Sequence, residues 1–215
     1  MNRSYLVTAT AVAVIVVLFS VVIFHKSQNK TKPVNNFATL VSETPGVFIN
    51  NIPAKQGSRI HPRDIVESDG ENYRLKISDA VVLDVQNKSR LWYFEKDGII
   101  RVELIEGAVA FVADSTKKPN RMVFSTPTGD IETDGAVFYA RVLSPDETYV
   151  CICHGQINIK TKNETKTVPA DHHGGYTIRK VGQSEKILPG EVKYHDDRLL
   201  EEMAAGINYK IEFRQ

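Results

Sequence analysis

Between Pro45 and about Val181, short runs of apolar residues alternate position by position with polar ones. Runs such as Tyr73–Ile77 and Val81–Val85 are rich in Val, Ile, Leu and Tyr, and Gly, Pro, Asn or Asp separates one run from the next. A period of two places alternate side chains on opposite faces of a strand. The pattern therefore predicts a mostly β domain over residues 45–181, built as an antiparallel sandwich or a flattened barrel.

Residues 182–215 are expected to form a C-terminal extension with one short helix. The stretch Asp196–Gly206 places acidic residues at its start and a glycine at its end, which are typical start and stop signals of a helix. Leu199, Leu200 and Met203 are expected to pack this helix against the sheet.

The chain begins with a long uncharged run. Tyr5–Phe24 contains twenty residues, seventeen of them apolar. As a helix it would be about 30 Å long, the thickness of a hydrocarbon core. A cleaved signal peptide is the alternative, but its apolar core is usually about 7 to 15 residues and precedes a small-x-small site. We therefore expect a cytoplasmic tip at 1–4, a transmembrane anchor in the lipid bilayer at 5–24 and a flexible, polar stalk at 25–44.

Charge and motif content argue against two classes of protein. The chain has 27 basic and 26 acidic residues, so it lacks the excess of basic residues expected of a partner of nucleic acid. It contains no G-x-S-x-G, no glycine-rich phosphate loop and no H-E-x-x-H, so no enzyme signature is present and a non-catalytic role is expected. Two cysteines are too few for a disulfide framework.

One group of residues could carry chemistry. Cys151, Cys153 and His154 lie within four positions, and His172 and His173 follow after a predicted hairpin. The flanking Val150 and Ile152 fit inward positions, so both cysteines are expected on the opposite, outer face of one strand.

The hairpin is predicted to bring the histidines to the cysteines. A turn at Asn163–Glu164 would place Ile159 opposite Val168 and His154 opposite His173. Thiolates and imidazoles that converge in this way suit zinc, iron or copper. Covalent haem attachment is not expected, because it requires C-x-x-C-H, one residue longer than Cys151–His154.

Two other interpretations of these residues stay open. Alternate residues of a strand are about 6.6 Å apart, so Cys151 and Cys153 could form a strained, easily reduced disulfide. The thiols could also pack under the C-terminal segment, with His172 and His173 as an ordinary polar turn. Asp171 and also His195, which lies beside Asp196 and Asp197, could add ligands, but the sequence does not place them. An isolated surface histidine would explain His195.

Several pieces of the chain, in their order and spacing, resemble the FecR domain, the periplasmic part of a bacterial iron-dicitrate signalling regulator. The resemblance covers about residues 45–180. Its glycines, among them Gly107 and Gly155, are expected where the chain bends between two strands. The pieces are Pro45-Gly-Val, Asp64-Ile-Val-Glu-Ser, Ser89-Arg-Leu, Leu104-Ile-Glu-Gly-Ala-Val-Ala-Phe-Val, Phe124-Ser-Thr-Pro-Thr-Gly-Asp-Ile-Glu-Thr-Asp-Gly-Ala-Val-Phe and Val150-Cys-Ile-Cys-His-Gly-Gln-Ile.

The resemblance implies a location and a class of function. It implies a single-pass anchor in the bacterial inner membrane with the C-terminal domain in the periplasm. In family members that regulate transcription, a cytoplasmic N-terminal region holds a sigma factor; here only residues 1–4 stand in its place, so that role is not expected. We expect a non-catalytic binding, sensor or scaffold module whose partner is another envelope or membrane protein. The alternative is a periplasmic metal-carrying or thiol-redox protein that uses Cys151, Cys153, His172 and His173.

Overall fold

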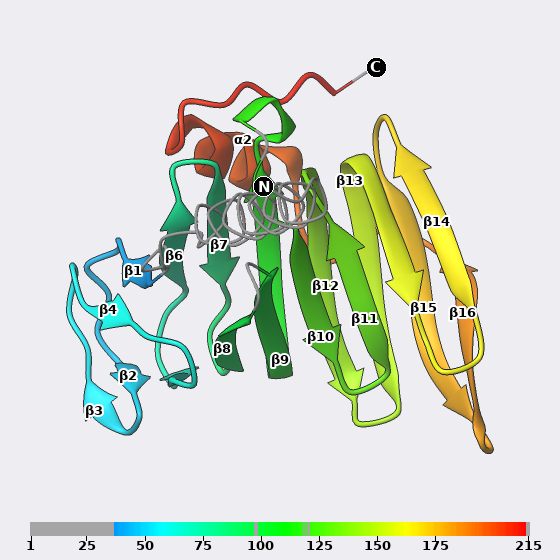
Figure 1. Ribbon diagram of the computed structural model, residues 1–215, viewed down its shortest axis with the longest axis horizontal. Helices are drawn as coiled ribbons and strands as arrows, with labels where there is room; N and C mark the ends of the chain where they lie inside the picture. The colour runs from blue at the N-terminus through cyan, green and yellow to red at the C-terminus, as the bar shows by residue number, and fades with distance from the viewer. Residues whose placement is uncertain (1–36, 97–98, 118, 120, 214–215) are drawn as a thin grey trace, which may run out of the picture. The chain divides into compact units, whose positions relative to one another are not determined.

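The computed structural model describes residues 37–213 except 97, 98, 118 and 120 (Figure 1). The predicted tip, the predicted anchor and most of the predicted stalk lie outside the described residues. Within the described part, none of the helices is long and apolar enough to cross a membrane.

The described residues are mostly strand, as predicted. The strands are β1 (Ala38–Leu40), β2 (Val47–Ile49), β3 (Ile52–Pro53), β4 (Arg59–Ile60), β5 (Ile65–Ser68), β6 (Tyr73–Ser78), β7 (Val81–Val85), β8 (Arg90–Lys96), β9 (Ile99–Ala113), β10 (Met122–Thr126), β11 (Gly129–Thr133), β12 (Ala136–Ser144), β13 (Glu147–Lys160), β14 (Thr165–Ala170), β15 (Gly174–Val181) and β16 (Ser184–Gly190). A short 3-10 helix, η1 (Ser115–Lys117), follows β9, and the helix α2 (Asp197–Ala205) follows β16.

Five strands close into a barrel. β9 pairs with β10, β10 with β11, β11 with β13, β13 with β12, and β12 again with β9. The prediction of a flattened barrel fits this ring, but the prediction of a wholly antiparallel domain is wrong at one pair. β10 runs parallel to the start of β9, with Met122 opposite Ile100. A parallel pair needs a crossover connection, and the second half of β9 together with η1 forms it.

The two longest strands bend at glycines rather than ending there. Gly107 lies inside β9 with φ 89°, and Gly155 lies inside β13 with φ 87°. These left-handed values favour glycine. A Cβ at Gly107 would also lie 2.0 Å from the Ser89 hydroxyl oxygen. The expectation that each glycine separates two strands is therefore wrong: each allows one strand to change partners, and β9 passes from β8 and β10 to β7 and β12.

Further strands extend the sheet on both sides of the barrel. β7, β6, β1 and β4 continue it from β9, and β15 and β16 continue it from β13. β1 and β16 lie outside the range 45–181 that the hydrophobic pattern predicted for the β domain. Both pair within the sheet, Ala38 opposite Ile60 and Ile187 opposite Ile178.

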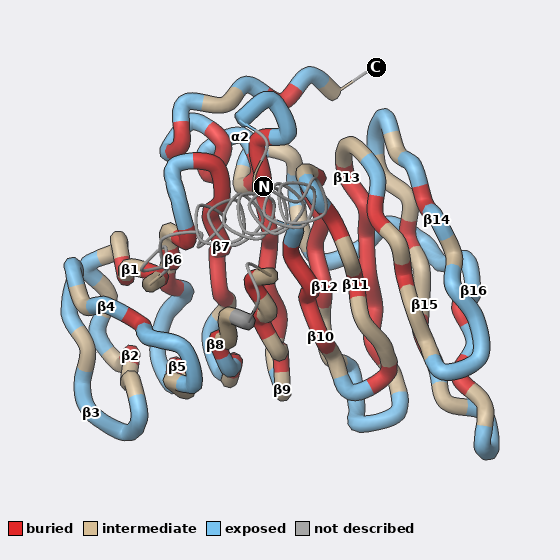
Figure 2. Tube along the Cα trace, in the orientation of Figure 1, coloured by how far each residue is buried: buried red, intermediate tan, exposed pale blue. Residues whose placement is uncertain are grey.

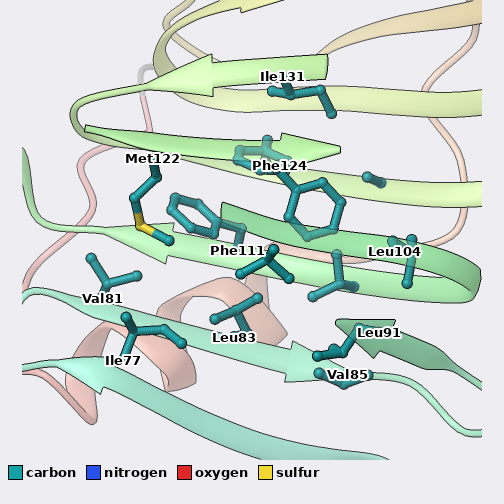
Figure 3. Packing of buried hydrophobic residues seen from close by; sticks show 14 of the residues in the cluster. Ile77, Val81, Leu83, Val85, Leu91, Leu104, Phe111, Met122, Phe124 and Ile131 are labelled. Carbon is teal, nitrogen blue, oxygen red and sulfur yellow. The ribbon is translucent and has the colours of Figure 1, made fainter. Parts of the chain in front are cut away.

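The main core fills the barrel and continues under β6, β7 and β8 (Figures 2 and 3). At its centre the rings of Phe111 and Phe138 stack with centroids 4.6 Å apart, and Phe124 meets Phe138 edge-on at 5.6 Å. Figure 2 shows the buried stretches concentrated in β7, β9, β12 and β13, whereas β3, β14 and β16 at the margins are largely exposed.

A second core lies on the other face of β7, β9, β12 and β13, under the C-terminal segment 191–213. The helix α2 begins after Asp196, whose side chain accepts a hydrogen bond from the Leu199 N–H, and ends at Gly206. The predicted helix and its signals are confirmed, and Leu200 and Met203 are buried as expected. The second core consists of Val82, Ala108, Ala110, Val112, Val137, Tyr139, Tyr149, Cys151 and Cys153 of the sheet and Leu200, Met203, Ala204, Ile207 and Ile211 of the C-terminal segment.

Candidate metal centre

Cys151 and Cys153 project from β13 into the second core. Val150 and Ile152 belong to the main core, so the predicted alternation along the strand is confirmed. The expectation that the cysteine face is an outer face is wrong, because both cysteines have 0% exposed area. The C-terminal segment covers them. Both thiols are free.

A β-bulge sits at Cys153. β12 pairs Val137 with His154 and Phe138 with Ile152, so Cys153 has no opposite residue in that strand. Bulges re-aim side chains and are frequent beside functional sites. The carbonyl of Cys153 instead accepts a hydrogen bond from the His173 N–H at 3.4 Å, which holds the β14–β15 turn against the bulge.

His173 reaches the cysteines from the β14–β15 turn. Its Nδ1 lies 3.7 Å from Cys151 Sγ. The residue has φ 49°, a left-handed conformation that few non-glycine residues adopt, histidine more often than most. Such conformations cluster at functional sites.

The predicted hairpin register is wrong by two residues. The Thr161 N–H donates to the Glu164 carbonyl at 2.9 Å, so the turn lies at residues 162–163 rather than 163–164. Ile157, not Ile159, therefore lies opposite Val168. The shift still leaves His173 beside the cysteines, because the bulge at Cys153 lies at the same end of the hairpin.

His195 supplies a fourth group, from the segment between β16 and α2. Its Nε2 lies 3.2 Å from Cys153 Sγ, and its ring stacks on Tyr139 at 5.1 Å. The preceding residue, Tyr194, has φ 76°. The sequence did not place His195. The signal that could have found it is its position just before the Asp196 cap of a helix whose apolar face covers the cysteine face.

The four groups lie close enough together to bind a single metal ion. One ligand atom from each of Cys151, Cys153, His173 and His195 lies within 4.8 Å of every other. Zinc bonds of about 2.3 Å to sulfur and about 2.0–2.1 Å to nitrogen separate a sulfur and a nitrogen ligand by about 3.6 Å in a tetrahedron. The two S···N distances of 3.7 and 3.2 Å lie close to that value. Two thiolates and two imidazoles are a familiar zinc donor set.

Outer partners orient both histidine rings. His173 Nε2 lies 2.6 Å from an Asp197 carboxylate oxygen, and His195 Nδ1 lies 3.1 Å from the Lys193 carbonyl. A proton held at each of these nitrogens leaves the other ring nitrogen as the electron-pair donor toward the cysteines. Carboxylate and carbonyl partners of this kind are typical of metal-binding histidines.

The electrostatics of the cluster favour negative charge on one thiol. The pKa of Cys151 lies well below its ordinary value because of the hydrogen bond with Cys153 and, further, the His195 ring. Burial raises the pKa of Cys153. Burial also raises the pKa of Asp197, but hydrogen bonds with His172 and His173 outweigh it, so that pKa is lowered. A metal ion would compensate for the charge of two buried thiolates.

The other two predicted ligands have different surroundings. His172 Nε2 lies 3.0 Å from the second Asp197 oxygen, so His172 is a neighbour of the cluster through that carboxylate rather than a member of it. His154 Nδ1 is buried without a hydrogen-bond partner among the described residues, and His154 is not among the four convergent groups.

Comparisons with known proteins give a limited result. No family model and no curated protein matches the chain. Two crystal structures of a "putative anti-sigma factor" from Parabacteroides distasonis match with TM-scores of 0.48 and 0.47 and identities of 16% and 15%. Each match covers 58% of this chain and 57% of the solved chain. The chain thus matches little more than half the length of these structures, and neither similarity assigns a function.

Proposed function

We propose that this β domain is a non-catalytic module that holds one zinc ion at Cys151, Cys153, His173 and His195. The observation that carries the proposal is the convergence of two buried thiols and two oriented imidazoles within 4.8 Å. Four protein ligands fill a tetrahedral zinc site and leave no position for substrate, which is typical of structural rather than catalytic zinc.

The donor set favours zinc over the other metals considered. Copper(I) favours soft sulfur donors, most iron–sulfur clusters are held by four cysteines, and magnesium or calcium favours oxygen. A mixed pair of thiolates and imidazoles in a tetrahedral arrangement suits zinc. The supporting features are the Asp197 and Lys193 partners, which would hold the rings in the liganding tautomer.

Metal analysis of the purified full chain tests the zinc site. About one zinc per chain is expected. The double variant Cys151→Ser, Cys153→Ser should lose the ion, and His61→Ala, which changes an exposed histidine outside the cluster, should keep it. Zinc at a hundred times its dissociation constant would stabilise the fold by about 2.7 kcal/mol, so a chelator should lower the melting temperature by about 5 to 10 °C.

Thiol titration separates the zinc site from its alternatives. Zinc-bound cysteines should react only after the chelator is added. A redox pair would carry no metal and would change between zero and two thiols with reductant. Two free thiols at all times, no bound metal and no effect of chelator would contradict both functional interpretations and leave packing as the role of the cysteines.

We further propose that residues 5–24 anchor this domain to the bacterial inner membrane, with the domain in the periplasm and an envelope or membrane protein as partner. The length and apolarity of the run support the anchor, and the resemblance to the FecR domain supports the side and a sensor or scaffold role. Protease should digest residues 37–213 in spheroplasts without lysis. Digestion only after lysis would contradict the periplasmic location.

A further inference from the structure

The metal centre joins the sheet to the C-terminal segment 191–213, which, within the part of the chain that the structure describes, has no strand paired with the sheet. We infer, on the basis of the proposed zinc site, that the zinc ion holds the C-terminal segment 191–213 on the sheet and that loss of zinc releases the segment. We call this cross-link the clasp. Release would uncover the apolar face that this segment now covers. Metal occupancy would then control which surface the domain presents.

The ligands are divided unevenly between the two parts. Cys151 and Cys153 lie in β13, and His173 lies in the turn before β15, which pairs with β13. Three ligands therefore belong to the sheet. His195 alone belongs to the C-terminal segment, beyond the last strand, so an ion at the site would cross-link the segment to the sheet through this residue.

The polar contacts of the segment gather at the same place. The Lys193 N–H donates to the Tyr149 hydroxyl at 2.9 Å, and an Asp197 carboxylate oxygen lies 2.6 Å from His173 Nε2. Among the described residues, 191–213 contain no strand that pairs with the sheet. Without a ladder of backbone hydrogen bonds, attachment depends on the contacts around residues 193–197 and on apolar packing.

Polar contacts at the other end of the segment are few. Lys117 Nζ, in the exposed η1, donates to the Ile207 carbonyl. The other contacts here are apolar: Ile207 and Ile211 are buried, and the Phe213 ring lies against His172. These contacts hold the chain after α2, but they are remote in sequence from His195 and cannot replace a ligand there.

The helix depends on the sheet for its own stability. α2 has nine residues, and isolated helices shorter than about 12–15 residues are marginal in water. Leu200, Met203 and Ala204 are its buried positions, so an undocked segment would lose both its packing and its helix. Helix formation and docking of the segment are therefore coupled, so a cross-link that holds the segment on the sheet also favours the helix.

Proteolysis of the full chain in detergent tests the clasp. Arg198 and Lys210 are exposed trypsin sites in the segment, and Lys162 is an exposed site in the β13–β14 turn. Removal of zinc should speed cleavage after Arg198 and Lys210 by about tenfold or more, while cleavage after Lys162 should not change. His195→Ala should be cleaved fast in the segment with and without zinc, and His61→Ala should behave as the unaltered chain.

Metal analysis on the same samples separates the two proposals. If zinc is bound stoichiometrically but cleavage after Arg198 and Lys210 is the same with and without it, the clasp is wrong and the zinc site stands. If no zinc is bound, the site and the clasp fail together. The comparison of zinc-loaded and zinc-free unaltered chain needs no variant, so a folding defect in His195→Ala would not affect it.

Discussion

The two cores of this domain are closed in different ways. The main core fills a ring of paired strands and continues under β6, β7 and β8, so strands paired by backbone hydrogen bonds cover it, and its centre is a cluster of three phenylalanine rings. The second core lies on the outer face of the same strands, where much of its sheet side consists of alanine and valine, and a segment without strand pairing covers it. The Cys and His cluster occurs in the second core. The core whose cover lacks strand pairing is therefore the one that a bound ion could stabilise.

The largest effect on stability is expected from truncating a side chain at the centre of the main core. Phe138→Ala removes a fully buried ring that contacts Phe111 and Phe124. Truncation of a buried Phe costs about 3–5 kcal/mol of unfolding free energy. Urea unfolding should show a lower midpoint for the whole domain, including α2. Leu188→Ala, at a 39% exposed position, is the control and should change stability by less than about 0.5 kcal/mol.

A smaller, local effect is expected from the second core. Met203→Ala removes a fully buried side chain of α2, and the usual range for this change starts at about 2 kcal/mol. The segment can respond by undocking, so amide exchange should accelerate across residues 197–205 and remain slow in β9 and β12. Equal acceleration in all three elements would show that the two cores unfold together and would remove the distinction between them.

The smallest effect is expected from Glu132 of β11, whose contribution to stability depends on pH. Burial raises the pKa of Glu132, but hydrogen bonds with Lys160 and Arg121 outweigh it, so its pKa lies below the ordinary value near 4.5. A lowered pKa stabilises the fold above that ordinary value, and the contribution disappears as pH falls through the folded-state pKa. Glu132→Gln should therefore cost about 0.5–1 kcal/mol at pH 7.

The measurement for Glu132 is unfolding at several pH values. The difference between the unaltered chain and Glu132→Gln should shrink as pH drops below about 4.5 and vanish once the carboxyl is protonated. A difference that stays constant from neutral to acid pH would mean that the substitution acts through packing instead of charge.

Local signals predicted much of this fold. Period-two runs located strands such as β6 and β7, and the acidic start and Gly206 located α2, because these features depend on nearby residues. The parallel pairing of β9 and β10 was missed because it depends on the path of a whole crossover. The bends at Gly107 and Gly155 were recognised, but strand continuity through them depends on partners far along the chain.

The candidate site was predicted in part for the same reason. The shared face of Cys151 and Cys153 follows from strand geometry alone, and the hairpin brings His173 near even with a register error of two. His195 could not be placed, because its position depends on how α2 docks. The burial of the thiols was missed because the cover lies some forty residues further along the chain.

The central strand β9 also constrains the order of folding. It pairs with β7, β8, β10 and β12, two of them on each half of its length. The ring closes only when β13 pairs with β11, which places Lys160 opposite Asp130, thirty residues earlier in the chain. Such non-local pairings slow folding, since loop entropy is lost before the contacts form. His195 comes later still in the chain, so during synthesis the barrel strands emerge before the last ligand, and the site can be completed only on a sheet that already exists.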